Sequence, residues 1–417
     1  MQMSRSLMSS RILSSPKPFK NLPTLTCRLS STLPIRYLND SNPAIYPPPS
    51  YQRSDVLIHP QTGVKTGVVP SPPLAMTPLE IANLDQTSEL GGTPALGFYS
   101  PPPIVPWGSS LSLRSPEVSF DYFDLLGSSE CNDEALVQLY KHGILRVYNT
   151  PTDQDGQWLL AECFSGGGKD KRDERDRSIY TSNSGPMKTL YGTTWSTSTS
   201  SSLQGSSTST ADSAYTSLPL PLHTDMTYFH SPPGLQIFTM SSPAPNGGGA
   251  SVYRDGFEAA RALFELDRGA FEILTEAEFT YRYIDEDQGW HLEASGPIIS
   301  VDKTRLHEDG TPVVKSIRHN DLDRVGFLPP LTASVPSAWY DTVDLALRKW
   351  DEVVHERGRV KEHLRAGEAV IVHNNRVMHA RESFELGEGE ERSIVGCYVS
   401  REDIESRWRR VMTKRLE

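Results

Sequence analysis

Short apolar runs separated by Gly, Pro and Asn dominate the chain from about Val118 onward. Runs of this length, bounded by turn residues, are typical of the short strands of antiparallel sandwiches and barrels. The pattern predicts strands at residues 144–148, 235–240, 251–254, 278–283, 298–301, 369–373 and 393–399. We therefore expect a mainly β fold.

Three further segments are predicted helices, at residues 133–142, 258–266 and 338–356. The last has the clearest helical spacing, and its apolar positions are Trp339, Val343, Leu347, Trp350 and Val354. Large apolar side chains three and four residues apart form a stripe that packs into a core. Strands and helices together predict a β-sandwich or jelly roll with helices against one face.

Residues 1–39 differ from the rest, because they are rich in Ser, Arg and Lys and the first acidic residue is Asp40. This composition is typical of a mitochondrial transit peptide. It predicts a protein of the mitochondrial matrix. The alternative is a disordered basic tail on a cytoplasmic protein.

A Pro-rich stretch at residues 40–115 precedes the predicted folded domain, residues 116–417. Proline removes backbone donors and stops helices, so we expect this stretch to be extended or loosely ordered. Polar insertions near residues 165–185 and 196–210 interrupt the domain. The first carries a mixed-charge run and the second is almost all Ser and Thr, so we expect exposed loops or disordered insertions.

Composition excludes several classes of protein. The 417 residues carry a net charge of −11, which argues against nucleic-acid binding, because that requires clustered Lys and Arg. There is no run of about 20 apolar residues, so we expect no membrane span. The 4 cysteines are scattered, which excludes a disulfide framework and suits a reducing compartment.

The candidate chemistry begins at His223 and Asp225, in the segment LHTDMTYF. Residues two apart on a strand point to the same side, so both can ligate one metal ion. His379, just past the apolar strand at residues 369–373, is the predicted third ligand. Two His and one carboxylate on one face of an octahedron leave three positions open, as in the facial triad of non-haem Fe(II) oxygenases.

Arg392, on the strand that follows His379, is the predicted partner of an anionic co-substrate. An anion that chelates iron needs a cation at its far end, and Arg offers a bidentate fork to a carboxylate. This order of residues is typical of 2-oxoglutarate dioxygenases. Arg381 is the alternative cation, since it is nearer to His379, and His373 is predicted to pack in the core.

Several sequence blocks resemble trimethyllysine dioxygenase, within the gamma-butyrobetaine/trimethyllysine dioxygenase family of Fe(II)/2-oxoglutarate oxygenases. The blocks are ADSAYTSLPLPLHTDMTYFHSPPGLQIF, GGGASVYRDGFEAA, IRHNDLDR, NNRVMHARESF and RSIVGCYVSREDI. The resemblance covers roughly residues 118–407, with gaps at the two polar insertions. It implies a mainly β fold with α, namely a double-stranded β-helix (jelly-roll) core with supporting helices.

The resemblance also implies an activity. Fe(II) would bind at His223, Asp225 and His379, and Arg392 would pair with the distal carboxylate of 2-oxoglutarate. The reaction would hydroxylate N6,N6,N6-trimethyllysine at carbon 3, the first step of carnitine biosynthesis. O2 would be divided between product and succinate, and ascorbate would keep the iron ferrous. Relatives of this kind suggest a homodimer.

The substrate side rests on both physics and resemblance. A quaternary ammonium has no hydrogen to donate, and aromatic faces hold it best by cation–π attraction. The resemblance places substrate-binding residues at Tyr191, Trp195, Asp212, Tyr215 and Tyr398, with Asn320 as a candidate for a carboxylate. For each aromatic residue, core packing is the alternative.

Other functions remain open at this point. One is gamma-butyrobetaine dioxygenase or another 2-oxoglutarate oxygenase, and another is a catalytically silent jelly-roll binding protein. The triad together with Arg392 argues against the silent protein. The chain departs from the family in its Pro-rich N-terminal part and in the Ser/Thr insertion between Trp195 and Asp212, which interrupts the predicted cation site.

Overall fold

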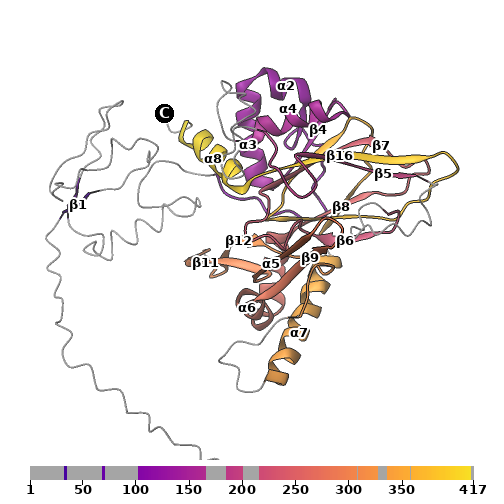
Figure 1. Ribbon diagram of the computed structural model, residues 1–417. Coiled ribbons are helices and arrows are strands. Elements are labelled where there is room, and N and C mark those ends of the chain that lie inside the picture. Colours follow the sequence, from indigo (N-terminus) through magenta and orange to yellow (C-terminus); the bar gives the residue numbers. More distant parts are fainter. Residues whose placement is uncertain are drawn as a thin grey trace, which may run out of the picture. The chain divides into compact units, whose positions relative to one another are not determined.

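The computed structural model describes residues 32–34, 68–70, 102–165, 185–200, 216–307, 309–326, 336–356 and 358–414 (Figure 1). Contacts divide the chain into two units, Met1–Gln86 and Thr87–Glu417. In the first unit, β1 (Thr32–Pro34) pairs antiparallel with β2 (Val68–Pro70). The predicted basic leader otherwise lies outside the described residues.

Two sheets form the centre of the second unit. The six-stranded sheet has the order β3 (Ser119–Asp121), β4 (Ile144–Tyr148), β14 (Ala369–His373), β7 (Leu235–Ser242), β16 (Glu391–Val399) and β5 (Thr194–Ser200). The four-stranded sheet has the order β13 (Arg359–Glu362), β8 (Ser251–Asp255), β15 (Val377–Arg381) and β6 (Leu220–His223). All neighbours in these two sheets are antiparallel except β3 and β4.

The two sheets enclose a shared apolar core. Phe238 of β7 and Val370 of β14 pack in one cluster with Tyr253 of β8 and Val377 of β15. Side chains alternate between the two faces of a strand. Ile371, next to Val370, therefore belongs to a second cluster on the outer face of the six-stranded sheet.

Helices cover the outer faces of both sheets (Figure 1). The helices against the six-stranded sheet are α2 (Tyr122–Gly127), α3 (Ser129–His142), α4 (Gln154–Phe164) and α8 (Arg401–Lys414). Those associated with the four-stranded sheet are α5 (Gly256–Leu266), α6 (Arg268–Glu276) and α7 (Pro336–His355). This confirms the predicted mainly β, jelly-roll fold with supporting helices, although the helices lie against both faces and not one.

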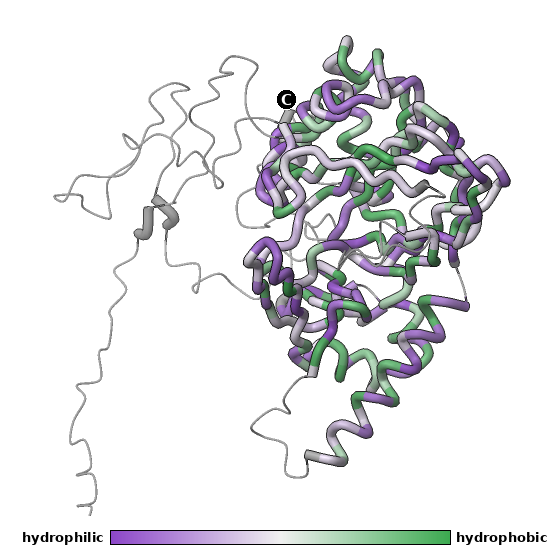
Figure 2. The backbone as a smooth tube through the Cα atoms, turned by 45° about the vertical axis from the view of Figure 1, so that its right-hand side comes forward, coloured by the Kyte–Doolittle hydropathy of each residue, from purple (hydrophilic) through white to green (hydrophobic). Residues whose placement is uncertain are grey.

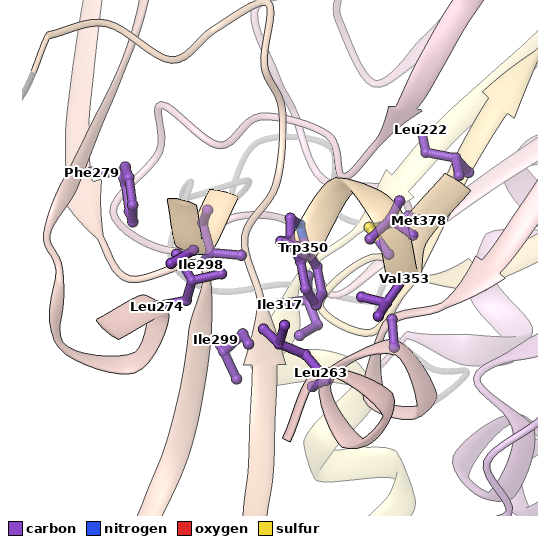
Figure 3. Close-up of a cluster of buried hydrophobic side chains, with 14 of the residues drawn as sticks. Leu222, Leu263, Leu274, Phe279, Ile298, Ile299, Ile317, Trp350, Val353 and Met378 are labelled. Atoms are coloured by element: carbon purple, nitrogen blue, oxygen red, sulfur yellow. The ribbon is translucent and has the colours of Figure 1, made fainter. Parts of the chain in front are cut away.

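Two hairpins extend from the second unit beside α5 and α6 (Figure 1). One joins β9 (Phe279–Asp285) to β10 (Trp290–Gly296), and the other joins β11 (Ile299–Leu306) to β12 (Pro312–Ile317). Figure 2 shows hydrophilic and hydrophobic residues alternating along the long helix α7. Its predicted apolar stripe is confirmed, since Trp350 is fully buried and lies near Ile317 and Val353 in the cluster of Figure 3.

Local sequence signals define several element ends. Asp255 caps α5 by accepting a hydrogen bond from the backbone N–H of Phe257 at 3.0 Å. Gly143 ends α3 with φ 72°, a left-handed conformation that glycine adopts without steric cost. Asp255 is also the last residue of β8, so strand β8 ends where α5 begins.

The Ser/Thr segment corrects an expectation. We predicted residues 196–210 to be a loop or insertion, but Thr194–Ser200 is strand β5 and pairs with β16. Thr197 and Thr199 are buried. Threonine suits a strand because of its β-branched side chain, and β16 supplies the backbone partners that the segment lacks by itself. Residues 201–210 lie outside the described residues.

The folded unit includes residues that precede the predicted boundary at residue 116. Trp107 and Leu113 are buried, and the indole Nε1 of Trp107 donates to the carbonyl of His142 at 2.6 Å. The predicted mixed-charge insertion falls on residues 166–184, which are outside the described part. Its flanks meet, because the N–H of Gly185 donates to Ser165 Oγ at 2.5 Å. None of the helices described here is long and apolar enough to span a membrane.

Candidate active site

The predicted metal ligands meet at two neighbouring strands of the four-stranded sheet, with Asp225 in the turn that follows β6. His223 ends β6 and lies directly opposite His379 of β15 in the antiparallel register. Asp225 Oδ1 is 3.2 Å from His223 Nε2 and 3.7 Å from His379 Nε2. One ligand atom from each residue lies within 4.8 Å of the others, so one ion can contact all three. The cluster is a two-histidine, one-carboxylate facial triad.

Hydrogen bonds orient these ligands. Nδ1 of His223 lies 2.8 Å from the carbonyl of Pro221, which can only accept, so Nδ1 carries the hydrogen and Nε2 is available to a metal. Asn374 holds the backbone of Asp225 on both sides, accepting from its N–H at 2.8 Å and donating to its carbonyl at 3.0 Å. The hydroxyl of Tyr398 donates to Asp225 Oδ2 at 3.0 Å.

The charges of the triad favour a divalent cation. Burial, together with the charge of the neighbouring His223, lowers the pKa of His379 to about 4. Burial acts to raise the pKa of Asp225, but the charges of His379 and His223 outweigh it and lower that pKa. Burial acts to lower the pKa of His223, but the hydrogen bond and charge of Asp225 outweigh it, so that pKa is raised. At neutral pH the site therefore offers an ionised carboxylate and a neutral imidazole at His379.

Arg392 is a buried cation at the edge of the same site. It lies on β16, is 3% exposed, and its Nη2 donates to the carbonyl of Gly249 at 3.3 Å. Its Nε has no hydrogen-bond partner, and no carboxylate in the described ranges forms an ion pair with it. Burial lowers its pKa to about 10, so it stays charged at neutral pH. A buried, unpaired guanidinium is costly by itself and favours an anionic ligand.

Arg381, the alternative cation, has a different environment. Its Nη2 donates to the carbonyls of Thr216 and Leu218 at 2.5 and 2.7 Å. These contacts hold the segment that leads into β6. Arg381 also lines the cavity, but two backbone carbonyls accept hydrogen bonds from its guanidinium, whereas among the described residues that of Arg392 has one such carbonyl.

A cavity of about 460 Å³ connects these groups. It is lined by the triad, by Arg392, and by the predicted residues Tyr191, Trp195, Asn320 and Tyr398. The rings of Trp195 and Tyr398 are 6.0 Å apart between centroids. The predicted Asp212 and Tyr215 lie outside the described residues.

A glycine makes room for the Trp195 ring. Trp195 lies opposite Gly396 in the pairing of β5 with β16. A Cβ atom at residue 396 would overlap the indole. The position of this ring in the cavity therefore depends on the pairing of an edge strand and on a residue without a side chain.

Sequence reasoning missed several residues of the site. Tyr228, Phe238, Tyr283 and Asp323 also line the cavity, and the rings of Tyr228 and Tyr283 are 5.0 Å apart. Asn374 was missed too. Tyr228 lies only three residues after Asp225, and Asn374 directly follows the predicted strand at 369–373, so both could have been found by proximity to the triad.

A facial triad in the cavity of a jelly roll is the arrangement of the iron-dependent oxygenases. The sequence profile of the taurine catabolism dioxygenase TauD, TfdA family matches residues 103–398. The chain belongs to this family, and it carries an HxD…H triad at His223, Asp225 and His379.

Relatives within the family carry more specific names. The chain is 34% identical over 245 residues to trimethyllysine dioxygenase of Neurospora crassa, covering 50% of this chain and 48% of that one. It is 29% identical over 308 residues to mitochondrial trimethyllysine dioxygenase of Gallus gallus, covering 72% and 63%. It is 33% identical over 199 residues to gamma-butyrobetaine dioxygenase of a Pseudomonas species, covering 47% and 48%. The chain thus spans from about half to just under two thirds of these relatives.

Among solved structures, a taurine dioxygenase from Burkholderia xenovorans is similar with a TM-score of 0.41 and 14% identity. That match covers 65% of this chain and 82% of the other.

Proposed function

We propose that this dioxygenase hydroxylates N6,N6,N6-trimethyllysine at carbon 3, using Fe(II) and 2-oxoglutarate. The observation that carries the proposal is one cavity that combines the triad, a buried Arg392 with no ion-pair partner among the described residues, and the aromatic residues Tyr191, Trp195 and Tyr398. The names of the similar fungal and avian enzymes support this choice of substrate.

His223, Asp225 and His379 would hold the iron, because one ligand atom from each lies within 4.8 Å of the others. When bound, Fe(II) supplies the reaction of O2 with 2-oxoglutarate that yields succinate and CO2. Asn374 and Tyr398 keep the Asp225 carboxylate in place throughout, because they bind its backbone and its second oxygen. Ascorbate is proposed as the external reductant.

Arg392 would bind the distal carboxylate of 2-oxoglutarate. A guanidinium pairs with a carboxylate through two parallel hydrogen bonds, and its buried position strengthens the attraction. Gly249 allows this arrangement, because a Cβ at that residue would come within 2.9 Å of Arg392 Nε.

The aromatic residues would hold the trimethylammonium group. Tyr191, Trp195 and Tyr398 present apolar rings to a cation that has no hydrogen to donate. The predicted residues Asp212 and Tyr215 are proposed members of the same site. By holding the cation at one end of the substrate, the rings would orient the carbon chain so that its reacting carbon faces the metal ligands.

The cellular setting is proposed from the sequence and one relative. The basic segment at residues 1–39 is proposed as a mitochondrial leader, followed by a Pro-rich region and the dioxygenase domain. The avian relative carries the word mitochondrial in its name.

Parallel assays test the proposal. Purified protein is incubated with Fe(II), 2-oxoglutarate and either trimethyllysine, gamma-butyrobetaine or lysine, and succinate and hydroxylated product are measured by mass spectrometry. We expect product from trimethyllysine alone, and none without iron. A preference for gamma-butyrobetaine would contradict trimethyllysine as the substrate. It would agree instead with the name of the similar Pseudomonas enzyme. Absence of succinate under all conditions would indicate a silent binding protein.

A further inference from the structure

Asp323 is a carboxylate of the active-site cavity that has no role in binding iron. It lies in the turn after β12, and its Oδ2 accepts hydrogen bonds from Thr227 Oγ1 and from Asn320 Nδ2, both at 2.8 Å. Both donors are neutral. These two hydrogen bonds orient the carboxylate and bring no positive charge to it.

The turn that carries Asp323 is bound to the turn that carries the metal ligand. The N–H of Thr224 donates to the carbonyl of His319 at 2.7 Å, and the N–H of His319 donates to Thr224 Oγ1 at 3.0 Å. Thr227, which binds Asp323, is two residues beyond Asp225. Hydrogen bonds from Thr227, beyond Asp225, and from Asn320, in its own turn, therefore hold Asp323 near the proposed iron ligands.

Asn320 stands beside Asp323 and complements it. Its carbonyl oxygen accepts from the N–H of Leu322 at 3.0 Å, and its amide nitrogen donates to Asp323. An amide nitrogen has two hydrogens to donate. Among the described residues, no partner accepts the second hydrogen, and Asn320 lines the cavity. The turn thus offers a negative charge next to a hydrogen-bond donor.

We propose that Asp323 is a specificity residue that binds the α-ammonium group of an amino-acid substrate, next to an α-carboxylate at Asn320. This inference rests on the proposed function and deepens it. In trimethyllysine, carbon 3 is bonded directly to the α carbon, whereas the trimethylammonium group is at the far end of the chain. The amino-acid head must therefore lie beside the reacting carbon, close to the metal ligands, where Asp323 is placed. Gamma-butyrobetaine has no α-ammonium group and gains nothing from this carboxylate.

The test compares two substrates that differ only in the α-amino group, namely trimethyllysine and 6-(trimethylammonio)hexanoate. Each is assayed for kcat/KM with the wild type, with Asp323→Asn and with Asp321→Asn. Asp321 is the matched control, because it is an acidic residue of the same turn that pairs with Arg324 at 2.8 Å and does not line the cavity.

We expect the wild type to prefer trimethyllysine at least about tenfold. Asp323→Asn should lower kcat/KM for trimethyllysine roughly 10- to 100-fold, as expected for loss of a charge-assisted hydrogen bond, and change the value for the hexanoate by less than about threefold. Asp321→Asn should keep the wild-type preference. Equal losses with both substrates would show that Asp323 only braces the turn, and would overturn the proposal.

Two further readouts keep the outcomes distinct. The wild-type comparison requires no variant, so equal kcat/KM for the two substrates overturns the role of Asp323 even if Asp323→Asn does not fold. If neither compound is hydroxylated, binding is read from changes in the visible absorption of the Fe(II)–2-oxoglutarate protein. Suppose that α-amino acids alter this absorption in the wild type and not in Asp323→Asn. This result would support binding of the α-ammonium group by Asp323, although trimethyllysine would no longer be the proposed substrate. The absence of such a difference would overturn Asp323.

Discussion

The two sheets contribute to the cavity in different ways. The four-stranded sheet places His223 and His379 opposite each other on paired strands, so the backbone register sets their separation. The six-stranded sheet contributes Arg392 and Tyr398 from β16 and Trp195 from the edge strand β5. The comparison teaches that the separation of the two histidines depends on strand register, whereas the residues proposed to recognise co-substrate and substrate come from the other sheet. The two functions should therefore be separable by mutation.

The largest effect is expected at the four-stranded sheet. Asp225→Ala or His223→Ala should reduce succinate formation and hydroxylation to background, because only two ligands remain for the metal. Both residues are partly exposed and lie at the end of β6, so the melting temperature of the metal-free protein should change little. The matched control is His291→Ala, which removes an exposed histidine of β10 outside the cavity. Normal turnover by the Asp225 variant would show that the triad is misassigned.

A smaller and more selective effect is expected at Arg392. Arg392→Ala should raise the KM for 2-oxoglutarate about 10- to 100-fold, because a hydrogen bond to a charged group contributes about 1.5–3 kcal/mol. Binding of Fe(II) alone, measured by titration, should stay within about twofold. Arg392→Lys should recover only part of the affinity, since an ammonium cannot form the bidentate pair.

Arg381→Ala is the comparison for Arg392. Its guanidinium binds the carbonyls of Thr216 and Leu218, so its loss should lower stability more than 2-oxoglutarate affinity. If the 2-oxoglutarate requirement changed in the Arg381 variant and not in the Arg392 variant, the assignment of the two arginines would be reversed.

Asn374 connects the two sheets, and its variant should have an intermediate effect. Asn374→Ala leaves the N–H and carbonyl of Asp225 without their partner. Loss of such an outer-shell contact lowers metal affinity or activity roughly 10-fold or more. Fe(II) titration and kcat at saturating iron separate the two effects. If Fe(II) affinity and kcat were both unchanged, the hydrogen bonds from Asn374 would not be needed to position Asp225.

The smallest effect is expected for the aromatic residues of the six-stranded sheet. Trp195→Ala should raise the KM for trimethyllysine roughly 2- to 30-fold, which corresponds to a cation–π contribution of about 0.5–2 kcal/mol. Gly396→Ala should act in the same direction, because its Cβ displaces the indole. Trp290→Ala, on the exposed face of β10, is the control. Decarboxylation of 2-oxoglutarate without substrate should be nearly unchanged in all three variants.

Several elements follow from local pattern alone. The predicted strands at residues 144–148 and 369–373 have the bounds that the structure shows, and the apolar stripe around Trp350 lies on α7. The end helix α8 was not predicted, because its buried Ile404, Trp408 and Val411 are separated by charged residues that dominate the composition. A stripe of three apolar residues was enough for a helix once α3 was present to pack against it, through Tyr140 and Leu136 around Trp408.

The sequence by itself determined the order and chemistry of the iron site. His223 and Asp225 were predicted to share one strand face, but β6 ends at His223 and Asp225 lies in the turn that follows it. His379 and Arg392 lie on the strands β15 and β16. Only the tertiary structure decided that Thr194–Ser200 becomes an edge strand, that Asn374 holds Asp225, and that Asp323 and Tyr283 reach the cavity. These contacts join segments that are distant in the chain. Local periodicity reports which face of an element is apolar, but it does not encode which other element will cover that face.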